Sequence, residues 1–158
     1  LYFKNKDEIL INAIVDHTEY FTDLLQDLYE NRERLRNNLI KELWSRFIDF
    51  YEKEPYTFNA SLYFQNSEMI LNLPEDLRES INESGSRVVN LQHKIIEYGV
   101  KTGLFIECNP MTLAEVIWTS FLGIIQLEKS KKVLSRKGHY ETTRDLALEV
   151  LTRGILKR

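Results

Sequence analysis

The stretch "GLFIECNPMTLAEVIWTSFLGIIQL", residues 103–127, contains the signals that decide the fold. Gly103 suits the left-handed residue that ends a helix. Asn109 followed by Pro110 suits the start of the next helix, because an Asn side chain caps free N–H groups and proline lacks the N–H that this position leaves unpaired. The apolar residues that follow recur with helical spacing. We therefore predict a helix over about 111–129.

The same helical spacing continues through the rest of the chain. The sequence has six Gly, three Pro and no Asn-Gly or Asp-Gly hairpin signal. Strand-like alternation of apolar and polar residues is absent. The prediction is an all-α fold for the 158 residues, with no linker that separates domains. The other predicted helices cover about 6–29, 32–53, 55–66, 74–103 and 141–156.

Composition restricts the class of protein. Hydrophobic residues make up 43% and charged residues 28%, as in ordinary globular proteins. The single cysteine, Cys108, excludes an internal disulfide and a multi-cysteine metal site. The net charge of −3 provides no broad basic face for nucleic acid.

The single cysteine suits a reducing cytosol. No signal or transit peptide is visible. The most apolar stretch, residues 111–127, is shorter than a membrane span and contains Glu115 and Gln126. We expect a cytoplasmic protein without a membrane contact.

The last two predicted helices are the most informative on physical grounds. The first of them is apolar around most of its circumference, so it must be covered on all sides. One side can face the chain's own core and another a partner chain, which would give a four-helix bundle with two helices from each protomer. The alternative is a monomer core, and the pattern favours the homodimer. The residues expected at its interface are Ile117, Phe121, Ile124, Val150, Leu151 and Gly154.

No constellation of catalytic residues is visible. The three histidines lack the Glu-x-x-His spacing of helical di-metal sites, and no HExxH, GxSxG or phosphate-binding loop occurs. Cys108 stands beside a helix start, where a thiol pKa can fall, although a small residue in a turn is the simpler interpretation. We predict that the chain is not an enzyme and binds no metal or cofactor.

Aromatic residues occur on several of the predicted helices. Such residues usually form a core, yet buried tyrosine hydroxyls and histidines need hydrogen-bond partners, and small-molecule sites combine apolar walls with a few polar groups. The residues alone leave core and pocket equally open. The candidates for a ligand pocket are Tyr20, Phe47, Tyr51, Tyr63, Phe64, His93 and Trp118.

A basic run, "KSKKVLSRKG", covers residues 129–138. It can contact an anionic partner, or it can be a solvated connection with cations near a helix C-terminus. The sequence pattern favours the solvated connection.

The stretch "LYFKNKDEIL", residues 1–10, resembles the end of the DNA-binding module of TetR-family transcriptional regulators. The order of features agrees: an aromatic pair, a lysine-containing link, an acidic pair and an aliphatic pair. Residues 103–127 resemble the family's penultimate segment, in which a Gly ends one helix and an Asx-Pro starts the apolar helix of the dimer bundle. Helix count, order and lengths agree over the whole chain. The matched residues at the start are Tyr2-Phe3, Lys4-Asn5-Lys6, Asp7-Glu8 and Ile9-Leu10.

The resemblance implies that residues 1–5 are a remnant of a helix-turn-helix domain and that residues 6–158 form a ligand-binding and dimerisation domain. The family's first three helices are not in this sequence. Tyr2, Lys4 and Lys6 match positions that approach the DNA backbone, and such contacts position a protein without specifying sequence.

The function that the resemblance implies is a homodimeric repressor that binds a palindromic operator. A small, mostly apolar effector among the first five visible helices would release it. The alternative is a helical ligand-binding or scaffolding protein without a DNA role.

Overall fold

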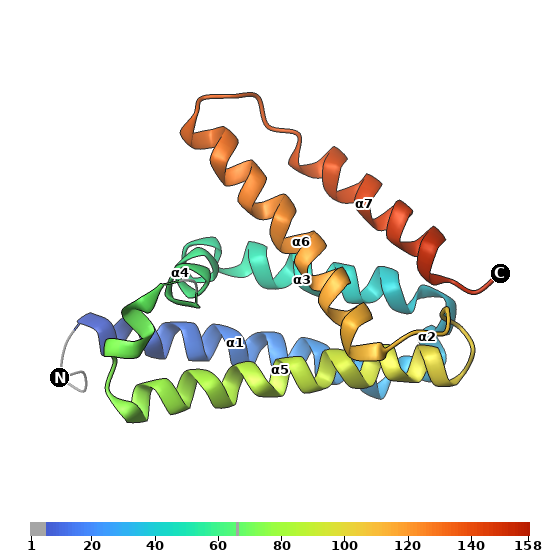
Figure 1. Ribbon diagram of the computed structural model, residues 1–158, viewed down its shortest axis with the longest axis horizontal. Coiled ribbons are helices and arrows are strands. Elements are labelled where there is room, and N and C mark those ends of the chain that lie inside the picture. The colour runs from blue at the N-terminus through green and yellow to red at the C-terminus, as the bar shows by residue number, and fades with distance from the viewer. Residues whose placement is uncertain (1–5, 66) are drawn as a thin grey trace. The chain divides into compact units, whose positions relative to one another are not determined.

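The helices predicted from the sequence are present in the computed structural model, which describes residues 6–65 and 67–158 (Figure 1). Within these residues the fold is all-α, as predicted, and an isolated β-bridge joins Phe105 to Leu156. The elements in chain order are α1 (Lys6–Glu30), α2 (Arg32–Leu35), the 3₁₀ helix η1 (Arg36–Asn38), α3 (Leu39–Lys53), α4 (Pro55–Gln65), the 3₁₀ helix η2 (Glu68–Asn72), α5 (Glu75–Lys101), α6 (Pro110–Val133) and α7 (Tyr140–Ile155).

The helix start predicted at Asn109 and Pro110 is present in the structure. Pro110 is the first residue of α6, and the Asn109 side chain accepts a hydrogen bond from the Thr112 backbone N–H at 3.0 Å. The predicted helix over 32–53 is instead interrupted by η1. Consecutive asparagines favour this interruption, because their side chains compete with helical backbone hydrogen bonds.

The described residues form two compact units. The first contains residues 6–30 and 45–92, and the second contains residues 31–44 and 93–158. Helices α3 and α5 therefore contribute one part to each unit.

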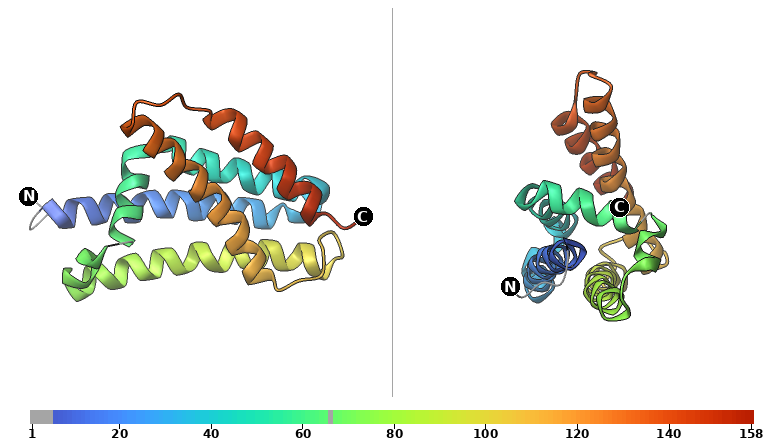
Figure 2. Two further views of the ribbon diagram at one scale, coloured as in Figure 1. Left: turned by 45° about the horizontal axis from the view of Figure 1, so that its top comes forward. Right: turned by 90° about the vertical axis from the view of Figure 1, so that its left-hand side faces the viewer.

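In the first unit, α1 lies alongside α5 and packs against α4 (Figures 1 and 2). Ile11 and Ile14 of α1 are buried against Phe64 and Leu73. An ion pair between α1 and α5 adds a link at the surface, with Arg87 and Glu19 3.4 Å apart. Since both partners are more than half exposed, this pair stabilises the fold little and the apolar contacts dominate.

In the second unit, α6 and α7 run antiparallel and pack side by side (Figures 1 and 2). The chain enters this pair through a turn at the end of α5. Gly103 has the left-handed φ of +71°, and the Leu104 N–H donates to the Gly99 carbonyl at 2.9 Å. The Gly103 N–H also donates to the Val100 carbonyl at 3.1 Å, which completes a Schellman motif. The predicted helix end at Gly103 is thus confirmed.

A short backbone bridge then holds the end of α7. The Ile106 N–H donates to the Ile155 carbonyl at 2.8 Å, and the Lys157 N–H donates to the Leu104 carbonyl at 2.9 Å. Between them lies Phe105, which is only 1% exposed. Its ring fills the space that a Cβ on Gly99 would need. Because Gly99 has no side chain, the Phe105 ring can pack directly against α5 as the chain passes over this helix.

We predict opposite effects for two Gly→Ala substitutions in α5. Gly85→Ala is expected to raise the unfolding free energy by about 0.5–1 kcal/mol, because alanine favours helix and a Cβ there meets no atom within 4 Å. Gly99→Ala is expected to lower it by about 1–3 kcal/mol, because the new Cβ overlaps the buried Phe105 ring. Urea unfolding of both variants measures the difference. Equal stabilisation by the two substitutions would contradict the role of Gly99.

Candidate functional site

Three of the predicted pocket residues lie around an aromatic cluster in the first unit. Phe21 of α1 stacks on Phe50 of α3 with ring centroids 4.2 Å apart, and Phe50 meets Phe58 of α4 edge to face at 5.2 Å. Phe47 is fully buried, while Tyr20 and Tyr51 lie at the margin and are half-buried. These rings pack on one another, so the cluster is a filled core at its centre.

His17 is the polar member of this cluster. Its side chain is buried, its ring lies 4.3 Å from the Phe50 ring, and Nε2 is 2.7 Å from the Phe50 carbonyl oxygen. The carbonyl can only accept, so Nε2 carries the proton. Burial lowers the pKa of His17 below its ordinary value, against the opposing effects of the Phe50 carbonyl and Glu54. At neutral pH the ring is therefore neutral and joins α1 to the last turn of α3.

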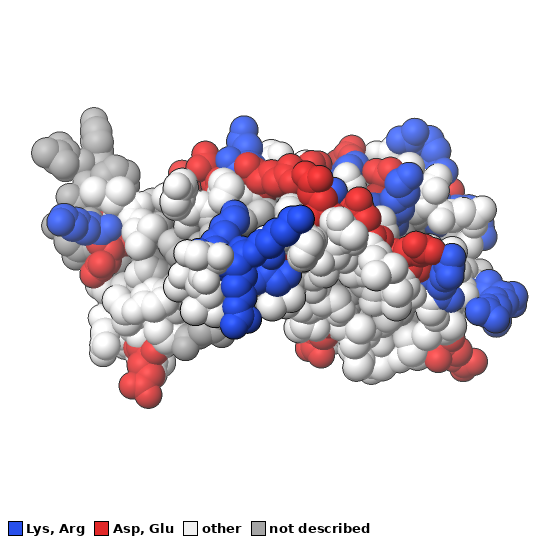
Figure 3. Space-filling model, turned by 90° about the horizontal axis from the view of Figure 1, so that it is seen from above, with Lys and Arg blue, Asp and Glu red and all other residues white. Residues whose placement is uncertain are grey.

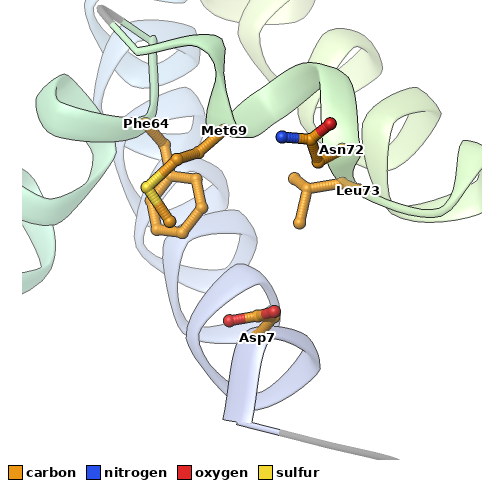
Figure 4. A pocket seen from close by; sticks show the side chains of 5 residues that line it. All are labelled: Asp7, Phe64, Met69, Asn72 and Leu73. Carbon is orange, nitrogen blue, oxygen red and sulfur yellow. The ribbon is translucent and has the colours of Figure 1, made fainter.

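A shallow hollow lies beside the start of α1 (Figure 4). Phe64, Met69 and Leu73 supply apolar surface, while Asp7 and Asn72 supply a carboxylate and an amide. Its volume is ≈ 100 Å³, whereas sites for drug-sized ligands span roughly 300–1,000 Å³. The hollow therefore accommodates one ring or a short chain of a ligand. Phe64 is the predicted pocket residue that lines it.

The remaining predicted pocket residues are spread over the chain. Tyr63 is 60% exposed on α4. His93 on α5 and Trp118 on α6 are half-buried, and Trp118 stacks on Phe121 with ring centroids 6.1 Å apart. The predicted set thus includes a buried core residue, a surface residue and one wall of the hollow. Sequence reasoning missed Asp7, Met69, Asn72 and Leu73, which come from a helix start, from η2 and from the residue after η2, without helical apolar spacing.

The residues predicted at a dimer interface separate into two groups. Ile117, Phe121 and Ile124 are buried within the chain itself. Val150 is 62% exposed, Gly154 is exposed and Leu151 is half-buried.

Both helices of the α6–α7 pair carry exposed apolar side chains at helical spacing. Val116 and Leu127 lie on α6, and Leu146 and Val150 lie on α7, each 46–62% exposed. Gly123 has open space around it and lies between Val116 and Leu127 on the same helical stripe. The sequence did not indicate that Val116, Leu127 and Leu146 are exposed, because a helix that is apolar all round does not show which side its own chain covers.

Helix α6 is the one helix among the described residues that is long and apolar enough to cross a membrane. Core helices of water-soluble proteins meet the same criterion. Helix α6 packs on α7, and 33% of its most apolar stretch is buried within the chain. Within residues 6–65 and 67–158, no group of three or more His, Cys, Asp or Glu is arranged to hold a metal ion.

Of the residues predicted to approach DNA, Lys6 is exposed at the first position of α1. Tyr2 and Lys4 lie outside the described residues.

No protein-family model and no curated protein matches the sequence. The fold is similar to that of a protein with unknown function from Rhodococcus sp. RHA1. The TM-score is 0.76 at 15% sequence identity, and the match covers 99% of this chain and 76% of that one. The similarity establishes a shared fold.

We predict that stability falls as the pH drops below about 6.5, the ordinary pKa of histidine. His17 has a lowered pKa in the folded chain, so the unfolded chain binds the proton more readily in this range. His17→Gln keeps an N–H donor for the Phe50 carbonyl and should flatten the dependence between about pH 5 and 7. Thermal unfolding over this range measures the effect, with His139→Gln in the exposed connection after α6 as the control. An unchanged pH profile for His17→Gln would rule out this titration.

Proposed function

We propose that the chain is the effector-binding and dimerisation part of a cytoplasmic, TetR-like transcriptional repressor that a small, mostly apolar effector releases from DNA. The observation that carries the proposal is the antiparallel α6–α7 pair, which follows the Asn-Pro start and exposes apolar stripes on both helices. The pair has the position in the chain and the surface that a two-helix contribution to a dimer bundle requires.

The interface that we propose is centred on Val116, Gly123 and Leu127 of α6 and on Val150 and Gly154 of α7. The exposed aliphatic side chains supply apolar area, and the two glycines let a partner helix approach closely. Ile117, Phe121 and Ile124 support this face from inside the chain, because their buried side chains fix α6 in place.

The hollow beside α1 gives the effector a direct way to act. One of its walls is Asp7, in the first turn of α1, and the helix begins immediately after the segment that resembles the end of a DNA-binding module. A ligand group bound against Phe64 and Met69 would contact this first turn. For release from DNA, the effector must bind the arrangement that is incompetent for DNA more tightly than the competent one.

We predict that the chain is a dimer at micromolar concentration and that Val150→Asp dissociates it. Placing a carboxylate in an apolar interface leaves an unpaired buried charge, so the dissociation constant should rise at least about a hundredfold. Sedimentation equilibrium measures the change. Leu71→Asp is the matched control, because Leu71 is 65% exposed on η2, away from the α6–α7 pair in the sequence. A wild-type monomer would contradict the interface.

We predict that the full-length gene product binds a palindromic DNA site and that Lys6→Ala weakens this binding to all sequences by a similar factor. A phosphate contact positions without specifying, so the salt dependence of the affinity should also fall by about one unit of slope. Selection from random duplexes followed by titration at several salt concentrations provides both measurements, with Lys41→Ala as the control. Failure to select any DNA sequence would overturn the regulatory proposal and favour a helical binding protein without a DNA role.

A further inference from the structure

Positive charge is concentrated at the end of α6 and in the connection that leads to α7. Residues 129–140 contain five Lys or Arg and no Asp or Glu. Because the whole chain has a net charge of −3, the remainder carries −8. Figure 3 shows one group of Lys and Arg side chains near the middle of the face, with further Lys and Arg side chains elsewhere on it. We call this segment the basic tip, and its cations are Lys129, Lys131, Lys132, Arg136 and Lys137.

Two aliphatic side chains project from the middle of the basic tip. Val133, the last residue of α6, is 77% exposed, and Leu134 is 57% exposed. Single exposed apolar residues are common on protein surfaces. Two adjacent ones with cations on both sides are unusual. Val133 and Leu134 together form a small apolar surface that positively charged residues flank in the sequence. Surfaces that bind membranes peripherally combine these two features.

Backbone hydrogen bonds hold the tip in this form. The Arg136 N–H donates to the Lys131 carbonyl at 2.8 Å, and the Ser135 N–H donates to the Lys132 carbonyl at 3.2 Å. With Ser135 at a φ of +53°, these bonds form a Schellman motif that ends α6 and turns the chain sharply after Leu134.

A buried carboxylate fixes the other side of the connection. Glu128 is 8% exposed and accepts a hydrogen bond from the His139 backbone N–H at 3.4 Å. Lys131 lies 3.8 Å from the same carboxylate, so its charge is partly offset. The other four cations of the tip are exposed. These hydrogen bonds therefore hold the backbone of the tip in one conformation, from which the cations and the pair Val133 and Leu134 project.

We propose that the basic tip docks onto the surface of an anionic lipid bilayer. The exposed cations would lie at the lipid phosphates, while Val133 and Leu134 would enter the boundary between headgroups and acyl chains. The acidic remainder of the chain would be repelled by the same surface, which orients the tip toward it. A duplex nucleic acid would attract the cations through its phosphates, but this contact makes no use of the two aliphatic side chains. The proposal is independent of the DNA-binding function proposed above, and it departs from the expectation, drawn from the sequence, that the chain makes no membrane contact.

Flotation with lipid vesicles tests the docking. The wild-type chain should bind vesicles of phosphatidylcholine in which about a third of the lipid is phosphatidylserine, and should not bind phosphatidylcholine alone. Raising the salt concentration should release it. Lys132→Glu combined with Lys137→Glu should weaken binding at least about tenfold. Val133→Ser combined with Leu134→Ser keeps every charge and should weaken it by about threefold to tenfold, because less apolar surface enters the bilayer.

Matched control variants test whether binding depends on the tip itself or on any exposed cation or aliphatic side chain of the chain. Arg36→Glu combined with Lys41→Glu removes two exposed cations elsewhere, and Leu71→Ser removes an exposed aliphatic side chain elsewhere. Both should leave vesicle binding within about twofold of wild type, since neither alters the tip. Circular dichroism verifies that each variant is folded, and the serine pair tests the proposal even if the glutamate pair does not fold.

Three results would overturn the proposal. The first is no binding of the wild-type chain to anionic vesicles at low salt. The second is an equal loss of binding in the control variants. The third is binding of random-sequence duplex DNA through Lys132 and Lys137, without vesicle binding and unaffected by the serine pair, which would identify the tip as a nucleic-acid contact.

Discussion

The contact between the Phe105 ring and the bare backbone of Gly99 is the constraint on which the second unit depends. It allows the chain to leave α5 at Gly103 and to cross directly over the helix that it has just left. The crossing then brings the backbone beside Phe105 to the end of α7, where two hydrogen bonds are made. A larger residue at position 99 would move the ring, the bridge and the start of α6 together.

The helix boundaries were predictable wherever a local signal specifies the backbone. Asn109 and Pro110 start α6, and Gly103 ends the turn after α5, because capping and the left-handed conformation depend on neighbouring residues alone. The interruption at η1 was not predicted, since apolar spacing continues across it and only the weak helix preference of two asparagines marks it. The Rhodococcus structure shares the fold at 15% identity, which is consistent with a fold set by such patterns more than by particular side chains.

The candidate sites were less predictable, because they depend on which side of each helix its own chain covers. In α6, Ile117 and Val116 are neighbours of similar character, yet one is fully buried and the other is 46% exposed. A helix with apolar residues all round offers no sequence signal for that choice. The bond from His17 to the Phe50 carbonyl joins positions 33 residues apart, so the sequence could indicate only that a buried histidine needs a partner. Tyr63 is an aromatic residue at helical spacing, yet it is 60% exposed, so spacing alone does not indicate burial.

The connection between α6 and α7 also governs how the chain responds to proteases. Arg136 and Lys137 are exposed there, in a segment between two helices, which is the setting in which trypsin cleaves folded proteins most readily. A chain cut at this point would keep α7 in place through its packing on α6 and through the bridge between Phe105 and Leu156. The nicked protein would therefore behave as one particle until a denaturant separates the fragments. The denaturant concentration at which α7 is released would then report how firmly noncovalent contacts hold that helix.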